Sequence, residues 1–146
     1  MNKKVVIVDY GLGNIRSAQK SIEKAIELKK DKSTTVERSS RYESLHEATH
    51  IVLPGQGAFE ACINGLASLD GMLEELNNQI LFKKKPIFGI CVGMQLFADV
   101  SFENGEHKGL GWIGGKVLKI ESREKVFKPI TLRWRERFAW LAHIAK

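Results

Sequence analysis

The sequence predicts an α/β fold, with a mostly parallel sheet and helices on both of its faces. Short runs of aliphatic and β-branched residues alternate with segments whose apolar residues recur at helical spacing, up to about residue 98. Glycine-rich turns follow several of the apolar runs. This βαβ order is typical of parallel strands joined by crossover helices. In open sheets of this kind, ligands bind beyond the carboxyl ends of the strands.

The first half of the chain supplies three of the predicted strands. Residues 5–8 form a short β-branched run that predicts a buried strand, and residues 15–29 predict an amphipathic helix. Residues 34–37 predict a short second strand, and residues 50–53 predict a third. Between them, residues 42–45 predict only a turn or a poor helix.

The second half continues with helices and the central strand. Residues 58–66 and 69–82 are predicted to be helical, with a solvated run of lysines at 83–85 after the second helix. A central strand is predicted to start at Pro86. The later region is expected to be antiparallel or irregular, with alternation at residues 116–120 that predicts a strand.

Composition indicates a soluble globular protein of about one domain. The 146 residues are 43% hydrophobic, and no apolar run approaches the roughly 20 residues of a membrane helix. The first apolar run is too short for a signal peptide. Most of the net charge of +6 lies in residues 120–146, where seven Lys and Arg oppose three Asp and Glu. We expect no nucleic-acid partner, because no basic and aromatic array covers the body.

The cysteine content indicates a reducing compartment, and we expect the protein to be cytoplasmic. The chain has two cysteines, Cys62 and Cys91, and Cys62 lies in a predicted helix, so a disulfide framework is not expected. The cysteines and four histidines show no metal-ligand spacing. We expect neither a metal nor another cofactor.

Cys91 is the candidate nucleophile. It follows the central strand, lies between Gly89 and Gly93, and precedes residues that can start a helix. This is the strand–turn–helix pattern of a nucleophile elbow, with sulfur in place of oxygen. Backbone N–H groups at the start of that helix would favour the thiolate. The alternative is a buried structural cysteine.

Two further glycine-rich turns follow predicted strands. Residues 54–59, with Gly55 and Gly57 spaced by one residue, can direct backbone N–H groups at a developing oxyanion. Gly11 and Gly13 suggest a dinucleotide-binding turn, but Arg16 occupies the place of the third glycine. A simple strand-to-helix connection is the other interpretation of that turn.

Four segments together resemble class I glutamine amidotransferases and, within them, the glutaminase subunits of imidazole glycerol phosphate synthase in histidine biosynthesis. These segments are residues 8–14, 53–59, 89–95 and 108–111. The resemblance implies that Cys91 attacks the side-chain amide of glutamine, giving a thioester and ammonia. It implies oxyanion and substrate contacts from five residues: Gly55, Gln56, Gly57, Val92 and Gln95.

The resemblance also implies a heterodimer and a domain boundary. Ammonia would pass to a cyclase subunit with a barrel fold, near Asn14. Residues 1–126 are expected to be a partial amidotransferase domain without its C-terminal strands, and residues 127–146 a divergent basic and aromatic tail, for which a frameshift or premature stop is one hypothesis. A short amphipathic helix and a basic nucleic-acid arm are the other interpretations of that tail.

The chain departs from the family pattern in two ways. Gln56 stands where the family usually has a small apolar residue. The family's His-Pro-Glu segment, which supplies the general base, has no counterpart, because no His-x-Glu occurs in the chain. We therefore expect this chain to be inactive as given. Alternatives are another class I amidotransferase, a non-catalytic module with the same fold, or a cysteine hydrolase with another base.

Overall fold

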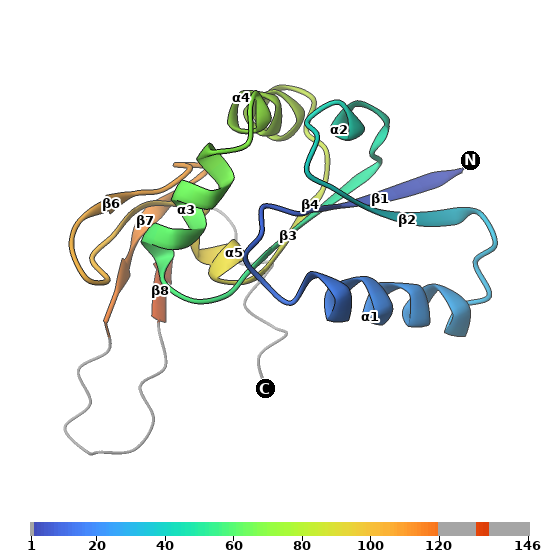
Figure 1. Ribbon diagram of the computed structural model, residues 1–146, viewed down its shortest axis with the longest axis horizontal. Coiled ribbons are helices and arrows are strands. Elements are labelled where there is room, and N and C mark those ends of the chain that lie inside the picture. The colour runs from blue at the N-terminus through green and yellow to red at the C-terminus, as the bar shows by residue number, and fades with distance from the viewer. Residues whose placement is uncertain (1, 120–130, 135–146) are drawn as a thin grey trace, which may run out of the picture. The chain divides into compact units, whose positions relative to one another are not determined.

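The computed structural model describes residues 2–119 and 131–134. The chain forms two compact units, Met1–Met94 and Gln95–Lys146. Figure 1 shows the elements of both units along the chain. The predicted boundary at Val126 stays a prediction, because residues 120–130 lie outside the described residues.

The first unit is built on a four-stranded parallel sheet, as predicted. Its strands are β1 (Lys3–Val8), β2 (Thr34–Ser39), β3 (His50–Gly55) and β4 (Ile87–Cys91), in the order β2-β1-β3-β4. All three neighbouring pairs run parallel. The carboxyl ends of β3 and β4 therefore meet at one edge of the sheet, where Gly55 is the partner of Cys91.

Helices cover both faces of this sheet. Helix α1 (Ile15–Leu28) lies on one face, and α2 (Ser44–Glu47) and α4 (Met72–Asn77) lie on the other (Figure 1). Helix α3 (Phe59–Ala67) follows β3. Because strand side chains alternate, Ile7 packs with Ile15 towards α1 while its neighbours point to the opposite face. The fully buried apolar side chains include these residues of β1, β3, α3 and α4: Val6, Val8, Ile51, Leu53, Phe59, Leu66, Met72 and Leu76.

The single helix predicted over residues 69–82 is wrong. Gly71 adopts φ +67°, a left-handed conformation that interrupts any helix, and α4 begins only at Met72. A Cβ at Gly71 would also lie 2.9 Å from the ring of Tyr42. A π-helical turn, η1 (Asn78–Phe82), then ends the segment. Met72 and Leu76 of α4 are fully buried.

The lysine run at 83–85 is only partly solvated. Lys85 is half-buried, and its ammonium donates to the backbone carbonyls of Leu45 and His46 at 2.8 and 2.9 Å. Burial lowers the pKa of Lys85, and the nearby Lys83 charge lowers it further. The prediction of a solvated run is therefore wrong for Lys85, which joins the segment before β4 to α2.

The second unit contains a four-stranded mixed sheet in the order β6-β5-β7-β8. Its strands are β5 (Ala98–Ser101), β6 (His107–Lys108), β7 (Ile113–Leu118) and β8 (Thr131–Trp134). β5 pairs parallel with β7, and the other two pairs are antiparallel. The strand predicted at residues 116–120 is thus confirmed, but it begins earlier, at Ile113, and ends at Leu118.

Strand β8 falls within the segment predicted to diverge, residues 127–146. It pairs antiparallel with β7, with Thr131 opposite Leu118. A helix over these four residues is therefore wrong, and the remainder of the tail lies outside the described residues. Within the described ranges, no helix is long and apolar enough to cross a membrane.

Candidate active site

The structure places Cys91 at a sharp turn between a strand and a helix. Cys91 is the last residue of β4, and α5 (Val92–Gln95) begins at the next residue. Its backbone has φ +55°, and its side chain is exposed. A non-glycine residue in this left-handed region is strained, and such strain persists mainly where the surroundings impose it, as at functional sites. The predicted elbow is confirmed, whereas a buried structural cysteine is not what the structure shows.

Two glycines, Gly55 and Gly93, allow the backbone at the end of β3 to contact the backbone that follows Cys91. A Cβ on Gly93 would lie 1.9 Å from the carbonyl oxygen of Leu53. A Cβ on Gly55 would lie 2.4 Å from the backbone nitrogen of Gly93. Neither position has room for a side chain, so glycine is required at both. The close approach holds the Gly55 loop against the first residues after Cys91.

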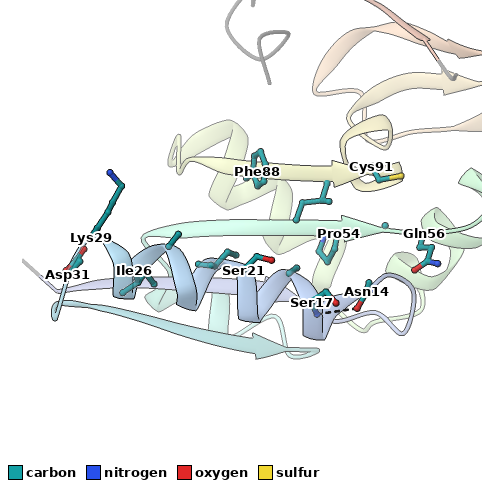
Figure 2. Close-up of a pocket in the computed structure, with 15 residues that line it drawn as sticks. Asn14, Ser17, Ser21, Ile26, Lys29, Asp31, Pro54, Gln56, Phe88 and Cys91 are labelled. Atoms are coloured by element: carbon teal, nitrogen blue, oxygen red, sulfur yellow. Dashed lines mark hydrogen bonds between the residues drawn. The ribbon is translucent and has the colours of Figure 1, made fainter. Parts of the chain in front are cut away.

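Cys91 opens into a cavity of about 620 Å³ that it shares with this loop. Figure 2 shows the lining, which comes from one side of α1, from the end of β3 and from β4. The cavity includes Asn14 and Gln56 at the same end as Cys91, and Ile26 and Lys29 lie towards the other. The described lining is mostly apolar and contains no histidine. The cavity can hold a small ligand against the sulfur, but its described lining offers no imidazole base.

Two buried side chains form hydrogen bonds to backbone carbonyls of the Pro54–Gly57 turn. The hydroxyl of Tyr10 donates to the carbonyl of Pro54 at 2.5 Å, and the thiol of Cys62 donates to the carbonyl of Gln56 at 3.4 Å. Both side chains are buried. Burial raises the pKa of Tyr10 far above its usual value, and the neighbouring Cys62 raises it further. The Tyr10 hydroxyl therefore remains protonated and able to donate at any ordinary pH.

The remaining predicted site residues are Asn14, Gly57, Val92 and Gln95, and each has a different environment. Asn14 caps α1, since its side-chain oxygen accepts from the Ser17 N–H at 3.2 Å. Gly57 is exposed with φ +96°, and nothing lies within 4 Å of its missing Cβ. Val92 is buried and, like Gly57, does not line the cavity. Gln95 ends α5; it is buried, and its Oε1 has no hydrogen-bond partner among the described residues.

Comparison with known protein families identifies the family to which the Cys91 turn belongs. The sequence model described as glutamine amidotransferase class-I matches residues 6–139, a range that includes part of the segment predicted to diverge. The chain belongs to the class-I glutamine amidotransferase family. The match covers the end of β1, the Pro54–Gly57 turn and the Cys91 elbow, so the resemblance found in the sequence is confirmed at the level of this family.

Curated members of the amidotransferase family include close relatives of the chain. It is 44% identical over 132 residues to "Imidazole glycerol phosphate synthase subunit HisH" of Pelagibacter ubique, covering 90% of the chain and 62% of that relative. The protein of the same name from Rhodospirillum rubrum is 43% identical over 133 residues, covering 90% and 61%. The chain thus spans about 60% of the length of these relatives.

A solved amidotransferase supports the fold. The chain is similar to a protein described as "Crystal structure of glutamine amidotransferase", with a TM-score of 0.63 over 84% of this chain and 59% of that one. At 16% identity, this similarity concerns the fold alone. It agrees with the α/β class predicted from the order of strands and helices.

Sequence reasoning missed two residues that contact the candidate site. Tyr10 lies in the glycine-rich segment of residues 8–14, and Cys62 lies in a predicted helix. Their contacts with the loop join positions 44 and 6 residues apart. The apolar side of α3 gave a signal that Cys62 points inward, but no periodicity indicates which carbonyl a buried donor meets.

Replacing Cys91 by glycine is expected to stabilise the fold. The left-handed backbone at Cys91 costs an ordinary residue about 1–2 kcal/mol, and glycine escapes this cost. Glycine's greater freedom in the unfolded chain offsets roughly 0.5–1 kcal/mol of the gain. Cys91→Gly should therefore be about 1 kcal/mol more stable than Cys91→Ala in urea unfolding. Equal midpoints for the two variants would contradict strain at this position.

Proposed function

We propose that the chain is a glutaminase subunit of imidazole glycerol phosphate synthase. The observation that carries the proposal is the strained, exposed Cys91, which shares a cavity with the Gly55 loop. Family membership and the name of the relatives at 43–44% identity support it. The substrate would be glutamine, which the cavity could admit as far as Cys91.

The proposed reaction proceeds through a thioester. The Cys91 thiolate attacks the side-chain amide carbon of glutamine, forming a C–S bond and an oxyanion. When the C–N bond breaks, the nitrogen leaves with a proton as ammonia. Water then attacks the thioester and releases glutamate and the thiol. The N–H groups of Val92 and of the Gly55–Gly57 loop would stabilise both oxyanions, and Gln95 would help to bind the substrate.

The ammonia would pass to a cyclase subunit in a cytoplasmic heterodimer. Asn14 lies at the cavity end nearest Cys91, which makes it a candidate for the partner interface. Its capping bond to Ser17 gives it a structural role as well. Both cysteines are free, which accords with a reducing compartment. The proposed chemistry needs no metal or organic cofactor.

An affinity label tests the proposal without requiring turnover. The chloromethyl ketone analogue of glutamine presents a carbon from which a thiolate displaces chloride. We expect it to modify Cys91 with saturation kinetics, at least about 10-fold faster than chloroacetamide, because binding places it beside the sulfur. Free glutamine should protect Cys91. Intact-mass and peptide mass spectrometry measure the extent and the position of labelling.

The matched control separates Cys91 from the chain's other thiol. Cys91→Ala should lose the label, whereas Cys62→Ser should retain it, because Cys62 is buried. The proposal would be contradicted if the chloromethyl ketone labelled Cys91 no faster than chloroacetamide does and glutamine did not slow the labelling. That outcome would favour the alternative function, a non-catalytic module, which the absence of histidine from the described cavity lining also permits.

A further inference from the structure

Gln56 and Gly57, the first residues after β3, have little conformational restraint of their own. Gly55 and Gly57 flank Gln56, and glycine loses more conformational freedom on folding than any other residue. Gln56 and Gly57 are both exposed, and Gly57 has open space around its α-carbon. A loop of this kind stabilises an oxyanion only if something else fixes the direction of its N–H groups.

Tyr10 holds the Pro54–Gly55 peptide at the end of β3. Its hydroxyl donates to the Pro54 carbonyl at 2.5 Å from a side chain that is only 6% exposed. A trans peptide directs its N–H opposite to its C=O, and the described chain has no cis bonds. Holding the Pro54 oxygen therefore also fixes the direction of the Gly55 N–H. The same hydroxyl lies 3.0 Å from the place of a Gly55 Cβ.

Cys62 fixes a second peptide two residues later. Its side chain is fully buried in α3, and its thiol donates to the Gln56 carbonyl at 3.4 Å. By the same geometry, this contact fixes the direction of the Gly57 N–H. Thiols are weak donors, so the contribution is smaller than that of Tyr10. The two contacts come from different parts of the chain, the turn after β1 and α3, and they bracket Gly55 and Gln56.

The position of Tyr10 is itself built into the fold. A Cβ at Gly65 would lie 3.1 Å from the Tyr10 ring, so the glycine in α3 leaves room for that ring. Gly55, directly after the carbonyl that Tyr10 holds, packs against the Val92–Gly93 peptide next to Cys91. A continuous series of contacts thus leads from the Tyr10 hydroxyl to the peptide after the nucleophile.

We propose that Tyr10 and Cys62 are positioning residues for acyl transfer at Cys91. By holding the carbonyls of Pro54 and Gln56, they keep the N–H groups of the Gly55–Gly57 loop aligned to receive the oxyanion. This inference rests on the proposed function, because it assumes that Cys91 reacts with a carbonyl carbon. It assigns the loop's alignment to two buried side chains that would not touch the substrate.

Two reagents distinguish alignment of the oxyanion-binding N–H groups from changes in the reactivity or exposure of the Cys91 thiol. The Cys91 thiolate attacks 4-nitrophenyl acetate through an oxyanion; a C–S bond forms, and 4-nitrophenolate leaves with the electron pair of the broken C–O bond. Iodoacetamide reacts by direct displacement of iodide, which forms no oxyanion. The ratio of the two second-order rate constants at Cys91 reports oxyanion stabilisation, and neither reaction needs the family's histidine base.

In the full 146-residue chain, Tyr10→Phe should lower this ratio about 10-fold, less than the 10²–10³ typical for complete removal of one oxyanion donor. Alkylation should change less than about twofold, because exposure of the sulfur is unaffected. Tyr42→Phe removes the chain's other phenolic hydroxyl, which is not part of the site, and should leave the ratio unchanged. Cys91→Ala gives the background from Cys62.

Cys62 provides an independent pair of variants. Cys62→Ala should lower the ratio, and Cys62→Ser, which retains a donor, should preserve most of it. If thermal melting shows that Tyr10→Phe does not fold, the ratios of Cys62→Ala and Cys62→Ser test the positioning role instead. Unchanged ratios in folded Tyr10→Phe and Cys62→Ala would overturn the positioning role, and so would an equal fall in acylation and alkylation.

The wild-type chain distinguishes this failure from failure of the proposed function. A wild-type ratio no higher than that of a small peptide thiol would overturn acyl transfer at Cys91, and the positioning role with it. A raised wild-type ratio that the variants do not lower would overturn the positioning role alone.

Discussion

Gly93→Ala is expected to destabilise the first unit by at least about 3 kcal/mol, because overpacking against backbone atoms cannot be relieved by a side-chain rotation. The new methyl group would lie 1.9 Å from the Leu53 carbonyl oxygen and 2.8 Å from its carbon. Either β3 or the start of α5 must move, and each carries part of the candidate site. Urea unfolding followed by circular dichroism measures the loss.

Gly114→Ala is the matched control for this change. Gly114 lies in β7, where a Cβ would meet only an Asp99 oxygen at 3.9 Å. Its unfolding midpoint should stay close to that of the wild type, because no atom has to move. If Gly93→Ala were as stable as Gly114→Ala, the close packing of the elbow on β3 would be wrong.

Glutamine turnover by the 146-residue polypeptide is expected to be very slow. Mixed with a cyclase subunit and glutamine, it should form glutamate at least about 100-fold more slowly than the synthase containing the Pelagibacter ubique relative, because general acid–base catalysis contributes about 10²–10⁴ in rate. No His-x-Glu occurs in the sequence, and no histidine is in the described lining of the cavity at Cys91. A coupled glutamate assay measures the rate.

A chimera provides the control for this expectation. Residues after Val126 would be replaced by the corresponding remainder of the Pelagibacter relative, which the family resemblance predicts to carry the His-Pro-Glu segment. Turnover should then rise by at least about 10-fold if Cys91 and its loop are competent. Comparable turnover by the unmodified chain and the synthase would show that another group serves as the base.

The fold of the first unit was predictable because its signals are local. The β-branched run at β1 and the apolar spacing of α1 each suffice to define their element. The elbow was predictable for a similar reason: Gly89, Cys91 and Gly93 lie within five residues and leave few alternatives to a sharp turn.

The features that sequence reasoning missed depend on contacts between distant residues or on single backbone angles. Gly71 could have been a tolerated helical glycine, and only its left-handed φ separates α4 from what precedes it. Strand β5 has only four residues, and it is defined by pairing with β6 and β7. Tyr10 and Cys62 meet the loop through the tertiary fold, which no spacing in the sequence encodes.

The contact of Lys85 with α2 has a consequence for how the chain acquires its structure during synthesis. A helix of four residues has no independent stability in water. The ammonium that binds its Leu45 and His46 carbonyls belongs to a residue 40 and 39 positions later. While a ribosome is still making the intervening segment, α2 lacks these two hydrogen bonds, which can form only after Lys85 has emerged.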